Sequence, residues 1–155
     1  MKKDQYPIEI TVDGQKIPAQ VEARTLLVDF LRDNAAETSV KIGCEEGACG
    51  ACTVNLDGKT TKSCLQLAIN CDGKEIRTVS SLRKKGKLGL LQQAFIDSHA
   101  LQCGFCTSGM LMSAEAFLQK NADSDFTEND IKEALTGNLC RCTGYDKIIR
   151  AVQEA

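Results

Sequence analysis

The chain has 155 residues, of which nine are cysteine, 43% are hydrophobic and 26% are charged. That length fits one ordinary domain or two small ones, and the composition excludes a largely disordered chain. Nineteen basic and 21 acidic residues give a net charge of −2, which predicts no binding to nucleic acid or anionic membranes. No apolar run approaches the ~18 residues that cross a bilayer and no apolar export segment opens the chain, so a cytoplasmic protein without membrane insertion is expected.

The first predicted element is a β-hairpin. Residues 8–12 alternate between apolar and polar side chains, and Asp13-Gly14 is a strong two-residue turn signal. The return strand is expected over 16–21. Pro18 within it has no N–H to donate, which predicts an edge position in the sheet.

A helix is expected next, over residues 26–34, with Thr25 as its N-cap. Its apolar side chains fall on one helical face, namely those of Leu26, Leu27, Phe30 and Leu31. A second hairpin is predicted over 53–56 and 59–63 around Asp57-Gly58, and a last strand over 75–79. Strands arranged around one helix favour a small β-grasp unit.

The apolar period changes to helical after residue 80. Four short helices are expected, over 88–100, 108–120, 127–135 and 145–154. Thr127 and Asp130 form a capping-box-like start to the third of them. The predicted fold class is therefore α+β, with a β-grasp domain over 1–80 and a four-helix domain over 81–155.

The basic run at 83–87 is interpreted as a solvated linker, with a basic docking patch as the alternative.

The cysteines carry the functional signal. A chain without an export signal is expected to stay in a reducing compartment, where disulfide bonds are unstable. Nine is also an odd number, so complete pairing within one chain is impossible. The cysteines form two groups of four and leave Cys71 over, which suggests two metal sites.

The first group is Cys44, Cys49, Cys52 and Cys64. Its first three members have the C-x4-C-x2-C spacing of plant-type [2Fe–2S] ligands. Three glycines fit such a loop, because glycine adopts positive φ and lets backbone N–H groups approach the sulfurs: Gly43, Gly47 and Gly50. A zinc knuckle, inert core thiols and a disulfide pair are the alternatives. The triplet matches paired zinc ligands poorly.

The second group combines Cys103-x2-Cys106 with Cys140-x-Cys142, each pair at the predicted start of a helix. Spacing alone leaves zinc and iron–sulfur equally open. A second redox cluster would give the first an electron partner, and helix N-termini stabilise anionic clusters, so [2Fe–2S] is preferred. His99, the single histidine, is expected on a helix surface, and a Rieske centre would need two.

Three segments, 43–54, 102–110 and 137–145, resemble the small iron–sulfur subunit of molybdenum hydroxylases, and the resemblance covers nearly the whole chain. That family includes xanthine dehydrogenase, aldehyde oxidoreductases, aerobic carbon monoxide dehydrogenase and N-heterocycle hydroxylases. The resemblance implies a plant-type ferredoxin-like N-terminal domain, a four-helix C-terminal domain and two [2Fe–2S] clusters.

The resemblance also implies partners and roles. A large subunit would carry a molybdopterin-type cofactor, a medium subunit would carry FAD, and a dimer of such heterotrimers would form. The proximal cluster, nearer molybdenum, would be held by Cys103, Cys106, Cys140 and Cys142, and the distal one by Cys44, Cys49, Cys52 and Cys64. Gln102 would contact the pterin, although a helix-end polar residue is the other interpretation. Ser108 stands where many relatives have proline, and Cys71, which matches no ligand, is expected to be a buried hydrophobe.

The predicted function is electron transfer, with no catalytic residue in this chain. Electrons would pass singly from the molybdopterin site through both clusters to the flavin subunit or another acceptor. A free two-cluster ferredoxin and a zinc-stabilised interaction module are the alternatives. The substrate of the complex stays open among carbon monoxide, aldehydes, purines and other N-heterocycles.

Overall fold

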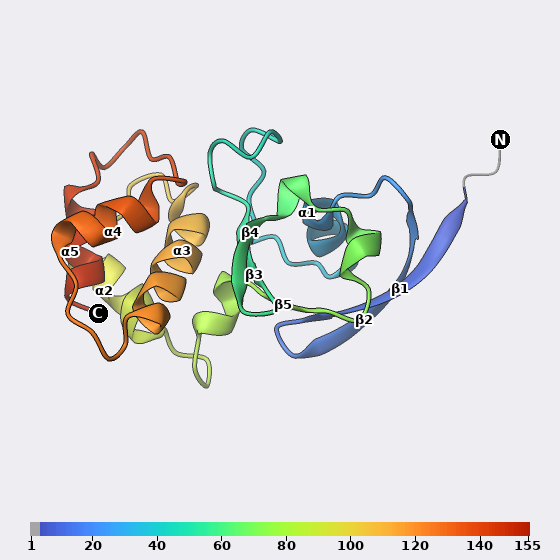
Figure 1. Ribbon diagram of the computed structural model, residues 1–155, viewed down its shortest axis with the longest axis horizontal. Helices are drawn as coiled ribbons and strands as arrows, with labels where there is room; N and C mark the ends of the chain where they lie inside the picture. The colour runs from blue at the N-terminus through green and yellow to red at the C-terminus, as the bar shows by residue number, and fades with distance from the viewer. Residues whose placement is uncertain (1–3) are drawn as a thin grey trace.

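The computed structural model describes residues 4–155, so the first three residues of the predicted N-terminal domain lie outside it. A mixed sheet lies at one end of the described chain and helices gather at the other (Figure 1). The strands follow the order β2-β1-β5-β3-β4. β1 and β5 are parallel and the other pairs are antiparallel. The strand bounds are β1 Gln5–Val12, β2 Gln15–Glu22, β3 Thr53–Leu56, β4 Lys59–Lys62 and β5 Glu75–Arg77.

Both predicted hairpins are confirmed. Asp13 and Gly14 have φ of 49° and 82°, and Asp57 and Gly58 have φ of 48° and 86°. Two consecutive left-handed residues are what a type I′ turn requires, and the twist of that turn matches the strands it joins. Pro18 lies in the edge strand β2, as predicted.

The predicted helix over 26–34 is split, and its predicted N-cap is wrong by one residue. α1 covers Leu27–Asp29 and continues as a π-helical turn over Phe30–Asn34. Leu26, not Thr25, is the N-cap, because the extended backbone of Leu26 forms a β-bridge with Leu67 and delays the first turn.

The last strand is shorter than predicted, because a distant side chain ends it. The Thr78 N–H and hydroxyl both donate to the Asp13 carboxylate, at 2.7 and 2.6 Å. The Thr78 oxygen then accepts the N–H of Ser80 at 3.2 Å and begins a 3₁₀ turn over Val79–Leu82. Residues 78 and 79 are therefore not part of the sheet.

The four predicted helices are present with mostly shorter ends, as α2 Leu90–Asp97, α3 Thr107–Lys120, α4 Glu128–Leu135 and α5 Asp146–Gln153. The predicted cap of α4 is confirmed, since the Thr127 N–H donates to Asp130 Oδ2 at 2.7 Å and the Asp130 N–H donates to Thr127 Oγ1 at 3.4 Å. The placement of His99 on a helix is wrong: it follows the end of α2 with a φ of 52°. Among the described residues, no helix has the length and apolarity to cross a membrane.

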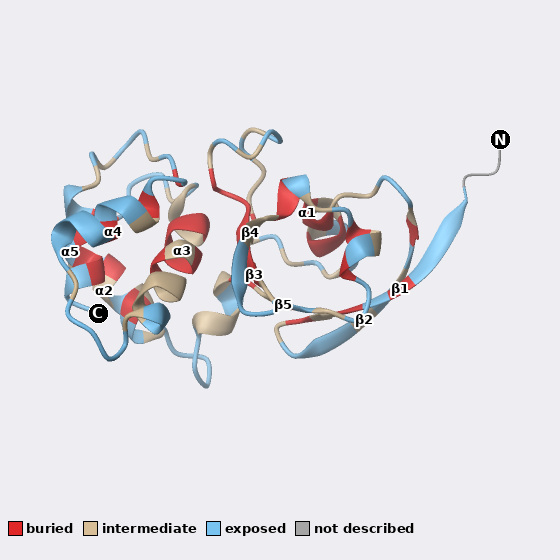
Figure 2. Ribbon diagram, viewed as in Figure 1, coloured by how far each residue is buried: buried red, intermediate tan, exposed pale blue. Residues whose placement is uncertain are grey.

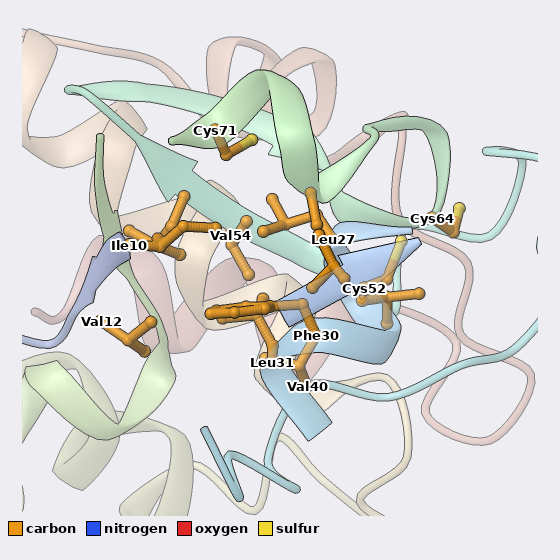
Figure 3. Packing of buried hydrophobic residues seen from close by; sticks show 14 of the residues in the cluster. Ile10, Val12, Leu27, Phe30, Leu31, Val40, Cys52, Val54, Cys64 and Cys71 are labelled. Atoms are coloured by element: carbon orange, nitrogen blue, oxygen red, sulfur yellow. The ribbon is translucent and has the colours of Figure 1, made fainter. Parts of the chain in front are cut away.

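Two separate hydrophobic cores lie beneath these elements (Figure 2). The first is built around Phe30 and Ile10 within the sheet half, residues 4–78, and the second around Phe95 and Ile131 within the helical half, residues 79–155. Cys71 is 1% exposed in the first core, which confirms the expected buried hydrophobe. Figure 3 shows Cys52 and Cys64 at the edge of that core and Cys71 apart from them. The predicted boundary after residue 80 stays a prediction.

Candidate metal centres

The first cysteine group comes together because a hairpin closes over it. Thr53 pairs with Lys62 at the open end of the β3–β4 hairpin, so Cys52 and Cys64 emerge beside each other. The hydroxyl of Ser63 donates to the Cys52 carbonyl at 2.8 Å and fixes this end. The loop over 43–52 supplies the other two thiols. These four cysteines and that loop are called the first cradle.

Within the first cradle the thiols form two pairs. The thiols of Cys44 and Cys49 lie close enough to interact, as do those of Cys52 and Cys64. The backbone N–H of Cys49 also donates to Cys44 Sγ at 3.3 Å. Backbone N–H groups thus face the sulfurs, as the glycine-rich loop predicts.

The second cysteine group assembles from two loops of the helical half. Cys106 is the N-cap residue of α3, whereas Cys140 and Cys142 lie in the loop between α4 and α5. Cys142 Sγ lies 3.5 Å from Cys103 Sγ, and the thiols of Cys106 and Cys140 lie close enough to interact. These two pairs are called the second cradle.

Both cradles fit a [2Fe–2S] cluster by their donor chemistry. Such a cluster has two irons, each of which takes two protein ligands, and each cradle offers two pairs of thiols. All nine cysteines are free thiols. Among residues 4–155, no three His, Cys, Asp or Glu side chains converge as they would on a single metal ion. A two-iron cluster does not require that convergence, because its four thiolates bind in pairs to different metal atoms.

The thiols of the cradles differ in acidity. Backbone N–H groups of Cys49 and Glu46 lower the pKa of Cys44 to about 7, because they stabilise the thiolate. Burial raises the pKa of Cys64 to about 11 and that of Cys106 to about 12. Since iron binds thiolates, the buried members must release protons when metal binds.

The three predicted loop glycines have different neighbours. A Cβ on Gly43 would lie 2.8 Å from Cys49 Sγ, and one on Gly47 would overlap Leu65. A Cβ on Gly50 would instead overlap the carbonyl oxygen of Gly137, which belongs to the other half. Gly43 and Gly47 therefore leave room within the first cradle. Gly50 leaves room for the second cradle to approach.

Asn138 joins the two cradles, and reasoning from the sequence missed it. Its side chain is 2% exposed, donates to the Gly50 carbonyl at 3.0 Å and accepts the Ser113 hydroxyl at 2.7 Å. The next residue, Leu139, donates its N–H to the Cys49 carbonyl at 2.8 Å. In Figure 1 the loops of both cradles lie along the same edge of the molecule. The only sequence signal for this contact is the position of Asn138 two residues before Cys140.

Tyr145 holds the same segment from the other side. Its phenol donates to the Asn138 carbonyl at 2.9 Å and accepts the Cys140 N–H at 2.8 Å. Its backbone has a φ of 73°, which non-glycine residues rarely adopt. The phenol therefore fixes residues 138–140, which connect the contact with the first cradle to Cys140 of the second cradle.

We expect Tyr145→Phe to lower the free energy of unfolding by about 1–2 kcal/mol, because one backbone donor and one acceptor lose their partner. Urea denaturation followed by circular dichroism measures this. Tyr6→Phe is the matched control, since Tyr6 is a half-exposed residue of β1 far from the cradles. Equal stability of the two variants would contradict a clamping role for the Tyr145 hydroxyl.

Gln102 lies at the edge of the second cradle. Together with Cys142, it lines a cavity of about 280 Å³. The other lining residues are His99, Leu101, Thr143 and Lys147. Gln102 is exposed, and its contact with a pterin stays a prediction.

The chain also matches known iron–sulfur protein families. Residues 10–79 match the 2Fe-2S iron-sulfur cluster binding domain, and residues 78–153 match a [2Fe-2S] binding domain. The chain is 51% identical over 149 residues to the caffeine dehydrogenase subunit gamma of Pseudomonas sp. (strain CBB1), a match covering 96% of this chain and 89% of that relative. It is 46% identical over 145 residues to the xanthine dehydrogenase iron-sulfur-binding subunit of Escherichia coli O157:H7, covering 94% and 91% of the two chains.

Among solved structures, a chain of quinoline 2-oxidoreductase from Pseudomonas putida 86 superposes with a TM-score of 0.92 at 44% identity. The superposition covers 96% of this chain and 91% of that one. The mixed sheet with its helices is thus a ferredoxin-like [2Fe–2S] fold. The chain belongs to the small iron–sulfur subunits of molybdenum hydroxylases, which transfer electrons in an oxidoreductase complex and do not themselves carry out its substrate chemistry.

Proposed function

We propose that Cys103, Cys106, Cys140 and Cys142 hold the proximal [2Fe–2S] cluster and that Cys44, Cys49, Cys52 and Cys64 hold the distal one. The single observation that carries the two ligand sets is the arrangement of each cradle as two pairs of neighbouring thiols. The order of proximal and distal cluster is the one that the family resemblance implies. We assign the distal cluster to a β-grasp domain over 1–80 and the proximal cluster to a four-helix domain over 81–155. The two separate cores support this division.

Electrons would cross between the cradles where their backbones meet. Bound clusters supply one-electron redox chemistry. The Cys49 carbonyl accepts the N–H of Leu139, the residue directly before Cys140. A ligand of one cradle is therefore connected to a ligand of the other through covalent backbone and one hydrogen bond. Asn138 and Tyr145 hold that connection in place.

Exposed apolar side chains around both cradles support docked partners rather than a freely diffusing ferredoxin. Near the second cradle, Leu101 is 41%, Phe105 48% and Leu139 58% exposed. Beside the first cradle, Leu65 is 59% exposed. Apolar side chains clustered at redox sites are typical of surfaces that a partner covers.

Each partner subunit is assigned to the exposed apolar residues beside one of the two cradles. The molybdopterin-binding large subunit would cover the cavity of Gln102 and Cys142, with Gln102 donating to or accepting from the pterin. The FAD-binding medium subunit would cover the face of Leu65, and two such heterotrimers would form a dimer. We place the complex in the cytoplasm, where a reducing environment keeps cysteines available as cluster ligands. The names of the relatives, which refer to caffeine, xanthine and quinoline, favour an N-heterocycle as the substrate of the complex.

Purification of the native protein tests this function. We expect co-elution with a molybdenum-containing chain, and about four irons and four labile sulfides per copy of this chain. Elution alone, with the same iron content, would support a free ferredoxin. Zinc without iron, in protein produced anaerobically with ample iron, would support the zinc-stabilised module and exclude both clusters.

A further inference from the structure

Lys62 places a positive charge between the two cradles. It is the last residue of β4, pairs with Thr53, which follows Cys52, and stands two residues before Cys64. Its ammonium donates to Thr53 Oγ1 at 2.8 Å and to the Gly137 carbonyl at 3.0 Å. The side chain is partly buried, and these hydrogen bonds hold its ammonium between Thr53 and Gly137 instead of leaving it in solvent.

The charge of Lys62 acts on the first cradle in particular. Both hydrogen-bond partners are neutral oxygens, so neither compensates the ammonium charge. Burial lowers the pKa of Lys62, whereas its electrostatic interactions with the thiols of Cys52, Cys49, Cys64 and Cys44 act in the opposite direction and favour the charged ammonium. In a partly buried site such interactions are screened less than on an open surface.

We propose that Lys62 tunes the reduction potential of the distal cluster. A cluster held by four thiolates is anionic and gains a further negative charge when it accepts an electron. A fixed cation beside it stabilises the reduced form more than the oxidised form and so raises its potential. A higher distal potential favours transfer of an electron from the proximal cluster to the distal one. Lys62 is a positioning residue: it does not bind the cluster, and its charge influences electron transfer only by changing the potential of the distal cluster.

This inference rests on the proposed assignment of the first cradle to the distal cluster. In the purified complex, we expect Lys62→Met to lower the equilibrium constant for reduction of the distal cluster about tenfold. For one electron this is a drop of ~59 mV in the distal potential. The proximal potential should move much less. Redox titration followed by electron paramagnetic resonance measures both, and the spectrum of Cys49→Ser identifies the distal signal by its loss.

Two matched variants separate charge from structure. Lys62→Arg keeps the charge and should keep the distal potential close to that of the wild type. Lys59→Met removes an exposed lysine at the other end of β4 and should change neither potential. An unchanged distal potential in Lys62→Met, equal shifts of both clusters, or a shift in Lys62→Arg as large as in Lys62→Met would overturn the proposal.

The failure of this inference differs from that of the proposed function. If the wild-type chain holds fewer than two clusters, or if Cys49→Ser removes the cluster nearer molybdenum, the ligand assignment is wrong and the tuning proposal fails with it. If four irons are present and Cys49→Ser removes the distal signal, an unmoved potential in Lys62→Met refutes the role of Lys62 alone.

Discussion

Replacement of Gly50 by alanine should separate the two cradles and lower the free energy of unfolding by about 3 kcal/mol or more. Gly50 has a φ of 73°, where a Cβ is strained, and the added carbon would overlap the Gly137 carbonyl oxygen. A Cβ on Gly109 of α3 would likewise overlap the carbonyl oxygen of Gly50. The backbones are therefore packed without space for a methyl group on either side.

Gly58→Ala is the matched control for Gly50→Ala. Gly58 has a φ of 86° in the β3–β4 turn, and nothing lies within 4 Å of its added Cβ. It should lose only about 1 kcal/mol through backbone strain. Urea denaturation measures both losses, and the magnetic interaction between the two reduced clusters should weaken in Gly50→Ala alone. If both alanine variants lose the same stability and keep that interaction, the close approach at Gly50 does not hold the cradles together.

Removing one ligand from each cradle should remove one cluster at a time. We expect Cys103→Ser to lose the proximal cluster and to slow reoxidation of the molybdenum partner, with about two irons left per chain. Cys49→Ser should lose the distal cluster and leave the proximal spectrum largely intact. The separate cores of the two halves are the physical reason, because each cradle is supported mainly by its own half.

Cys71→Ala is the control for these ligand substitutions. Cys71 is buried in the first core and lies outside both cradles, so this variant should keep about four irons and lose only packing energy. Iron analysis and visible absorption measure all three variants. Loss of both clusters in either serine variant would mean that the halves do not fold independently.

The cysteine spacing and the turn signals were readable from the sequence because they are local. A plant-type triplet needs three thiols on one loop, and each Asp-Gly pair needs only its own two left-handed residues, as at Asp57 and Gly58. The helical period likewise identified all four helices of the second half. The residues at which strands and helices end were less predictable wherever a residue distant in the sequence determines the end. Asp13 ends β5 through Thr78, 65 positions away.

By itself the sequence determined the chemistry: eight cysteines in two sets suited to [2Fe–2S] clusters, and one cysteine left for the core. Only the tertiary structure decided how the two sets meet. Asn138 reaches the Gly50 carbonyl across 88 positions, and Lys62 reaches that of Gly137 across 75. Such contacts depend on the docking of two separately packed cores, and neither residue spacing nor periodicity within one segment encodes that docking.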